Sequence, residues 1–225
     1  MQKETKNISL PLPLHMGSVN CYLIETDAGY ILIDTGGSNN RKELARELES
    51  AGCKPGLLKL IVLTHGDFDH TGNAAYLRNT YGSKVAMHAD DAGMVEHGDM
   101  FVNRKKPNLI IRKLLPLFSR FGRSECFTPD LLLKDGDDLS GYGFNANIVS
   151  IPGHSKGSIG IRTAGNDLFC GDLLVSTDQP VLNSLIDDLA AAHTSLSQLQ
   201  NLGIGTVYPG HGMPFSMQLV SEGSS

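Results

Sequence analysis

Residues 57–70 read LLKLIVLTHGDFDH, and this stretch decides how the chain folds and where its chemistry lies. Residues 57–63 are apolar except for Lys59, a run that predicts a buried β-strand. The strand leads directly into a loop that holds two histidines and two aspartates. In open α/β sheets, ligands bind at the carboxyl ends of the strands. We therefore expect this loop to lie at the edge of a sheet that carries a functional site.

Strand and helix patterns alternate on both sides of this stretch. Two β-rich runs, 19–25 and 30–33, are separated by the turn sequence TDAG and predict a hairpin. Helices are predicted over 41–51, 73–81 and 185–202, and further short strands over 85–88, 147–151, 159–163, 167–170 and 206–208. Interleaved strands and helices indicate one α/β layered domain that spans residues 1–225.

Four of the predicted strands end in polar loops that carry histidine or aspartate. These loops follow Leu63, Ile151, Cys170 and Tyr208, and they hold His65, Asp67, Asp69, His70, His154, Asp172 and His211. Imidazole and carboxylate groups are ligands of zinc, iron and manganese, and seven of them suffice for two ions. A single histidine in a turn is usually an ordinary polar residue, and we interpret His15, His88, His97 and His193 that way. Several strand-end loops that deliver such side chains together favour a metal centre.

The composition is that of a globular enzyme and argues against several other classes of protein. Hydrophobic residues make up 40% and charged residues 19%, which is not typical of a disordered chain. The net charge of −5 argues against a general nucleic-acid binder, which needs cationic surface. No apolar stretch is long enough for stable membrane insertion, and the first residues lack the apolar core of a signal peptide, so we expect a cytoplasmic protein. The four scattered cysteines are interpreted as small buried residues.

Residues 93–130 break the alternation of strands and helices. Within them, residues 100–124 hold seven basic residues and no acidic one, with apolar residues at helical spacing. We expect a helical insertion that covers the site as a lid, in which methionine and phenylalanine contact an apolar chain and basic residues attract an anionic group. A dimer contact and a surface helix with a solvated basic face are the alternatives, and the sequence leaves them open.

The motifs taken together resemble those of the metallo-β-lactamase superfamily, whose signature is T-H-x-H-x-D-H, then P-G-H, G-D and a final histidine. The corresponding residues are 64–70 (THGDFDH), 152–154 (PGH), 171–172 (GD) and 210–212 (GHG). The runs 19–24 (VNCYLI) and 31–36 (ILIDTG) are also similar to the first strands of the superfamily. This resemblance implies a four-layer αββα sandwich with a dinuclear metal site at one edge.

The resemblance also implies which residues bind each ion. The first metal would bind His65, residue 67 and His154, the second would bind Asp69, His70 and His211, and Asp172 would bridge the two. This chain has Asp67 where the signature has its second histidine. A carboxylate there makes the first site harder, which shifts its preference toward manganese or iron, although zinc is the metal we expect first. Asp34 is either a residue that orients a ligand imidazole or a turn residue.

The activity implied by the resemblance is hydrolysis of a small ester, thioester, lactone or amide, as in the glyoxalase II-like and lactonase-like branches. Two cations would make hydroxide available at neutral pH. Asp69 is the candidate catalytic residue, which orients the nucleophile and passes a proton to the leaving group. The alternatives are a phosphodiesterase and an iron-dependent oxidoreductase of the same fold. We expect a small-molecule substrate, anionic with an apolar part, and no nucleic-acid partner, and the oligomeric state is left open.

Overall fold

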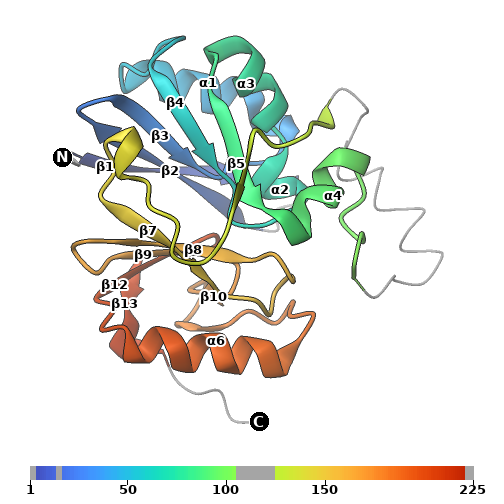
Figure 1. The fold of residues 1–225 in the computed structure, drawn as a ribbon, viewed down its shortest axis with the longest axis vertical. Helices are drawn as coiled ribbons and strands as arrows, with labels where there is room; N and C mark the ends of the chain where they lie inside the picture. Colours follow the sequence, from blue (N-terminus) through green and yellow to red (C-terminus); the bar gives the residue numbers. More distant parts are fainter. Residues whose placement is uncertain (1–3, 14–16, 105–124, 221–225) are drawn as a thin grey trace.

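The computed structural model describes residues 4–13, 17–104 and 125–220, and it arranges them as two β-sheets packed face to face between helices (Figure 1). The first sheet has the order β1 (Glu4–Pro11), β2 (Ser18–Thr26), β3 (Gly29–Ile33), β4 (Leu58–Val62), β5 (Lys84–His88) and β6 (Leu131–Leu133). The second has the order β13 (Phe215–Ser216), β12 (Thr206–Pro209), β9 (Leu168–Gly171), β8 (Ile159–Thr163) and β7 (Ala146–Ser150). Both sheets are mixed, because β3, β4, β5 and β6 pair in parallel and β12 pairs in parallel with β9.

Helices cover the outer face of each sheet (Figure 1). The first sheet is covered by α1 (Arg41–Ser50) and α3 (Ala74–Tyr81), and the second by α6 (Leu189–Asn201). The short helix α2 (Phe68–Thr71) follows β4, and α4 (Ala89–His97) follows β5 directly. A small hairpin, β10 (Leu174–Val175) with β11 (Val181–Leu182), and the 3₁₀ turns η2 (Ser38–Asn40), η4 (Ser140–Tyr142) and η5 (Met217–Leu219) complete the described elements. This is the four-layer αββα sandwich that the family resemblance implies.

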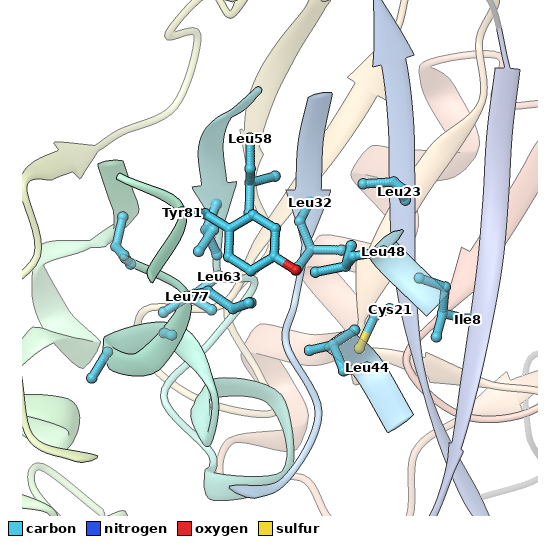
Figure 2. Packing of buried hydrophobic residues seen from close by; sticks show 14 of the residues in the cluster. Ile8, Cys21, Leu23, Leu32, Leu44, Leu48, Leu58, Leu63, Leu77 and Tyr81 are labelled. Carbon is cyan, nitrogen blue, oxygen red and sulfur yellow. The ribbon is translucent and has the colours of Figure 1, made fainter. Parts of the chain in front are cut away.

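The alternation of side chains along the central strands separates the core into layers. In β3, Ile31 and Ile33 pack between the sheets, together with Phe169 of the second sheet. Leu32 lies on the opposite face and packs in the cluster under α1, with Leu44 and other apolar residues (Figure 2). Strands buried on both faces need near-continuous apolar sequence, which explains why β4 is apolar apart from the exposed Lys59. A third cluster fills the space between the second sheet and α6.

Most of the predicted elements are confirmed, and the differences have local causes. The predicted hairpin and the helices over 41–51 and 73–81 are present, whereas β1, β6 and most of α4 were not predicted. The last helix begins at Leu189 rather than at residue 185, because the carboxylate of Asp188 caps it by accepting a hydrogen bond from the amide of Ala191 at 3.0 Å. The predicted helical insertion over 93–130 is helical at 93–97, and its residues 105–124 lie outside the described part of the chain.

Two predictions about the cysteines and the membrane can be compared with this fold. Cys21, Cys53 and Cys170 are buried, Cys126 is partly buried, and all four are free thiols. Within the described ranges, no helix has the length and apolar character needed to cross a membrane.

We predict that the apolar layers carry the stability of the fold. Leu60 of β4 is fully buried between the sheets, so Leu60→Ala should lower the free energy of unfolding by about 2–5 kcal/mol through lost burial and a cavity. Leu132 of β6, in the same sheet, is 59% exposed, and Leu132→Ala should change it by less than about 0.5 kcal/mol. Urea denaturation of both variants measures the difference, and equal losses would contradict this account of the core.

Candidate metal centre

The carboxyl ends of strands from both sheets meet at one edge, and they bring the predicted site residues together. Two sets of side chains place one ligand atom each within 4.8 Å of the others in the set. The first set is His65, His154 and Asp172, and the second set is Asp69, His70 and His211. Six of the seven predicted ligands therefore fall into two adjacent groups. Asp67, the seventh, contacts the first set in a different way that is described below.

All four imidazole rings at this edge are held through Nδ1. The acceptors are the Thr64 hydroxyl for His65 (2.9 Å), Asp34 Oδ2 for His70 (2.9 Å), the Leu185 carbonyl for His154 (2.6 Å) and the Ser18 carbonyl for His211 (2.7 Å). A carbonyl oxygen can only accept, so Nδ1 of His154 and of His211 carries the proton. In a neutral ring, Nε2 then has the free lone pair that a metal ion needs.

Asp34, at the end of β3, holds the His70 ring directly and the His65 ring through the Thr64 hydroxyl. Its Oδ2 contacts Nδ1 of His70 and accepts a hydrogen bond from the Thr64 hydroxyl at 2.8 Å, while its Oδ1 accepts one from the Thr64 amide at 2.8 Å. The Thr64 hydroxyl proton is thereby used, so the same oxygen accepts from His65 Nδ1. Asp34 has a left-handed backbone (φ 58°), a strained conformation that its three contacts maintain. The sequence left open whether Asp34 orients a ligand imidazole or is only a turn residue. The geometry supports the first interpretation.

Buried polar atoms without hydrogen bonds indicate that the centre is built for cations. Nε2 of His65, Nε2 of His70 and Oδ1 of Asp172 are buried and have no hydrogen-bond partner among the residues that the structure describes. Such atoms are costly unless a ligand satisfies them. Asp172 belongs to the first set, yet its carboxylate oxygens lie 3.3 Å from Nε2 of His70 and 3.2 Å from Nε2 of His211 in the second set. Its position between the two sets suits the predicted bridging role, and the residues present fit two divalent cations.

Close approach of the backbone allows this crowding. Gly210 lies directly before His211, and a Cβ atom there would stand 2.1 Å from Asp172 Oδ1 and 2.7 Å from the His70 ring. Any side chain at position 210 would therefore displace two of the candidate ligands. This explains on steric grounds why residue 210, directly before His211, is a glycine.

Burial and neighbouring charges shift the titration of these groups in opposite directions. Burial by itself lowers the pKa of His70, His154 and His211, but the carboxylates around them outweigh it and raise each pKa above the usual 6.5. For His65, burial and the neighbouring rings of His70 and His154 lower the pKa. Burial raises the pKa of Asp69, and the charges of Asp172 and Asp67 add to this rise against the opposing effect of His70.

Asp67 lies beside the first set and has a cationic partner that sequence reasoning missed. Its Oδ2 is 3.0 Å from Nε2 of His154 and 3.7 Å from Nε2 of His65. Its Oδ1 forms an ion pair with Nη1 of Arg104. Burial alone would raise the pKa of Asp67, but the hydrogen bond with His154 and the charges of His154, His65 and Arg104 hold it well below its usual value. Asp67, a predicted ligand, therefore lies at the centre, and its Oδ1 is occupied by the ion pair with Arg104.

Asp91 is a second residue that the sequence analysis did not single out. It is fully buried on α4, and its carboxylate accepts hydrogen bonds from the Gly66 amide (3.0 Å), the Ser155 hydroxyl (2.6 Å) and the Gly157 amide (2.9 Å). Gly66 belongs to the loop of His65, and Ser155 follows His154. Asp91 thus connects the two loops that deliver the first set of candidate ligands. An aspartate in the first turn of a helix is common, so only the fold reveals this function.

Most of the chain also matches a known protein family. The sequence profile described as the Metallo-beta-lactamase superfamily matches residues 16–211. This chain belongs to the metallo-β-lactamase superfamily.

Similar members of the superfamily include enzymes and metal-bound structures. Hydroxyacylglutathione hydrolase GloC of Haemophilus influenzae is 29% identical over 168 residues, which cover 72% of this chain and 70% of that protein. The acyl-coenzyme A thioesterase MBLAC2 of Bos taurus is 29% identical over 211 residues, which cover 85% and 72%. The crystal structure of TTHA1623 in a di-iron-bound form has a TM-score of 0.70 and 28% identity, and it covers 95% of this chain and 96% of that one. These relatives, with the two sets of metal-binding side chains, make this protein a metal-dependent hydrolase of the superfamily.

Asp91 should be needed for metal binding, whereas its neighbour Asp90 should not. In Asp91→Asn, the amide group can accept at one atom only, so a buried donor is left facing another donor, at a cost of about 1–3 kcal/mol. We expect a lower Tm and a loss of affinity confined mainly to one metal equivalent. Asp90→Asn is the control, because Asp90 is half-buried and, among the described residues, its carboxylate lies near Lys156 (3.3 Å) and His88 (3.9 Å) rather than a candidate ligand. Thermal unfolding and calorimetric zinc titration measure both effects, and the prediction fails when the two variants behave alike.

Metal affinity should fall as the pH is lowered from above neutrality. In the metal-free protein, the raised pKa of His70, His154 and His211 means that these rings hold protons at pH values where a free imidazole is neutral. A metal must displace each such proton, which costs up to about tenfold in affinity per pH unit for each proton released. Calorimetric zinc titration at several pH values in two buffers of different ionisation enthalpy counts the released protons. A pH-independent affinity between pH 6 and 8 would contradict the prediction.

Proposed function

We propose that this protein hydrolyses a thioester of a small acyl group at a centre of two divalent metal ions. The observation that carries the proposal is the convergence of four imidazole rings, each anchored at Nδ1, on a group of carboxylates in which Asp172 Oδ1, like Nε2 of His65 and of His70, is buried without a hydrogen bond among the described residues. The choice of a thioester among the hydrolysable acyl compounds is supported by two relatives at 29% identity, a hydroxyacylglutathione hydrolase and an acyl-coenzyme A thioesterase. This choice narrows the wider class of esters, thioesters, lactones and amides that the sequence favours.

The residues that would hold the ions are the seven candidate ligands. His65, Asp67 and His154 would bind the first ion, Asp69, His70 and His211 would bind the second, and Asp172 would bridge them. When bound, divalent cations supply Lewis acidity and lower the pKa of water at the site from about 16 toward about 7. Zinc suits this set of imidazole and carboxylate ligands. Iron and manganese also suit it, and the di-iron form of the similar TTHA1623 supports iron as the alternative.

Asp69 is the residue that would handle the proton. Its Oδ2 lies 3.6 Å from Nε2 of His211 and 3.9 Å from Nε2 of His70, at the edge of the second set. In the metal-free protein, burial and the neighbouring carboxylates raise the pKa of Asp69. A carboxylate at this position can act as general base toward water and then as general acid. Asp69 would orient the attacking water through one oxygen and then donate the proton to the leaving sulfur. A thiolate is a good leaving group, so Asp69 alone is enough to supply the proton that it takes up.

Exposed apolar side chains near the centre supply a surface for an acyl chain. Leu185 is 73% exposed and Leu189 59% exposed, and the carbonyl of Leu185 is the acceptor that holds His154. Met213, two residues after His211, is 71% exposed. Leu185 and Met213 lie on segments that orient or carry a candidate ligand, and their exposed side chains are the candidates for contact with an acyl chain. An anionic group on the substrate remains an expectation that rests on the basic residues of 105–124, outside the described part of the chain.

Two other activities remain as candidates with less support. An iron-dependent oxidoreductase is favoured by one observation, the likeness to the di-iron form of TTHA1623. A phosphodiesterase has no observation that favours it, and the acidic balance of the chain argues against a nucleic-acid substrate.

The proposal predicts the outcome of a substrate panel. Zinc-loaded protein should release thiol from short-chain acyl thioesters, including hydroxyacylglutathione and acyl-coenzyme A, at least about 100-fold faster than it cleaves a phosphodiester at equal concentration. Oxygen consumption by iron-loaded protein would instead support the oxidoreductase, and preference for the phosphodiester would overturn the proposal.

The same assay tests Asp69 separately from metal binding. Asp69→Asn should lower kcat by about 100-fold or more while KM changes little, because general acid–base catalysis contributes about 10²–10⁴-fold. Elemental mass spectrometry must show the same metal content in both proteins before the rates are compared. Unchanged kcat at equal metal content would reject the assignment of Asp69.

A further inference from the structure

Arg104 lies inside the candidate metal centre although it comes from a segment that contains no predicted ligand. It follows the turns after α4, and its side chain is only 7% exposed. Three groups surround its guanidinium: Asp67 Oδ1 is paired with Nη1, Asp187 Oδ2 lies 2.6 Å from Nε, and the His154 carbonyl lies 3.3 Å from Nη2. An arginine this deeply buried is rare unless carboxylates pair with it.

The pair of Arg104 and Asp67 changes the charge balance of the first set. Asp67 stands where the superfamily signature has a neutral histidine, so on its own it adds one negative charge. The guanidinium keeps its positive charge at all accessible pH values and cancels that addition. Arg104 contacts only Oδ1, which leaves Oδ2 directed at His65 and His154. The Asp67 and Arg104 side chains together carry no net charge and present Oδ2 of Asp67 as a single oxygen ligand, while Asp187 contacts the same guanidinium at Nε, away from the candidate ligands.

We propose that Arg104 is a positioning residue that makes Asp67 a substitute for the missing imidazole and thereby sets the metal affinity of the first site. The inference rests on the proposed metal centre but not on the identity of the substrate. Binding of a substrate anion is the other function that a buried arginine suggests. The contacts oppose it, because carboxylates and a carbonyl already lie against the donors of this guanidinium.

Residues 67 and 104 should therefore depend on each other. Asp67→His alone restores the signature histidine but leaves the guanidinium without its Asp67 partner beside a divalent cation. Arg104→Met alone frees Asp67, which makes the site more anionic and favours Mn²⁺ over Zn²⁺ relative to the wild type. The double variant Asp67→His/Arg104→Met has the neutral ligand and no cation, so the repulsion is removed.

A double-mutant cycle tests this dependence on the full-length, metal-free protein. Zinc and manganese affinities come from calorimetry, and metal equivalents after dialysis come from elemental mass spectrometry, with no substrate present. Asp67→His should weaken zinc binding at one equivalent by about tenfold or more, and the double variant should recover to within about threefold of wild type. Arg162→Met is the matched control, because Arg162 contacts Asn166 and Leu202 and no candidate ligand, and it should leave both affinities unchanged.

Two results would overturn the inference. One is additivity, in which the double variant binds zinc as weakly as the single changes predict when combined, because a purely structural role for Arg104 gives no recovery. The other is a wild-type zinc affinity in Asp67→His. Circular dichroism and thermal unfolding report whether each variant folds, and Arg104→Gln, which keeps a polar side chain without charge, replaces Arg104→Met throughout the cycle when that variant is unfolded. A wild-type protein that binds two ions but cleaves no thioester would reject the proposed substrate and leave this inference standing.

Discussion

Hydrogen bonds at Nδ1 fix four imidazole rings, and the arrangement of the whole centre depends on them. Each acceptor belongs to a different part of the fold: Thr64 after β4, Asp34 after β3, Leu185 before α6, and Ser18 at the start of β2. Both sheets must therefore be assembled before the four Nε2 atoms face a common centre. The two packed sheets are in this sense the support on which the candidate ligands are oriented.

The second feature of the site is that most of its buried carboxylates have a partner that compensates their negative charge. Carboxylates in a buried cluster repel one another and lose hydration, so each needs its own compensation. Asp34 has the His70 ring and the donors of Thr64, Asp91 has three donors from two ligand loops, and Asp67 has Arg104. Within the described ranges, Asp69 and Asp172 have only imidazoles as charged partners. The uncompensated charge is thus concentrated where two cations are expected to bind.

Local sequence predicted much of this arrangement, and its failures follow a physical pattern. The run before Thr64 and the motifs after Ile151, Cys170 and Tyr208 predicted strands and loops correctly, because burial and turn chemistry are encoded in neighbouring residues. The contact between Asp67 and Arg104 was not predicted, since it joins residues 37 positions apart through tertiary folding. The last helix was predicted to begin at residue 185, whereas Leu185 lies before that helix and its side chain is 73% exposed.

The most direct test of the account is the tautomer of each histidine in the zinc-loaded protein. Long-range ¹H–¹⁵N correlation spectra of protein with ¹⁵N-labelled histidine distinguish a protonated Nδ1 from a protonated Nε2 and detect the nitrogen that binds zinc. The account predicts that four of the eight histidines, His65, His70, His154 and His211, keep the proton on Nδ1 and bind zinc through Nε2. Zinc bound through Nδ1 of any of these rings, or spectra unchanged by zinc, would contradict it.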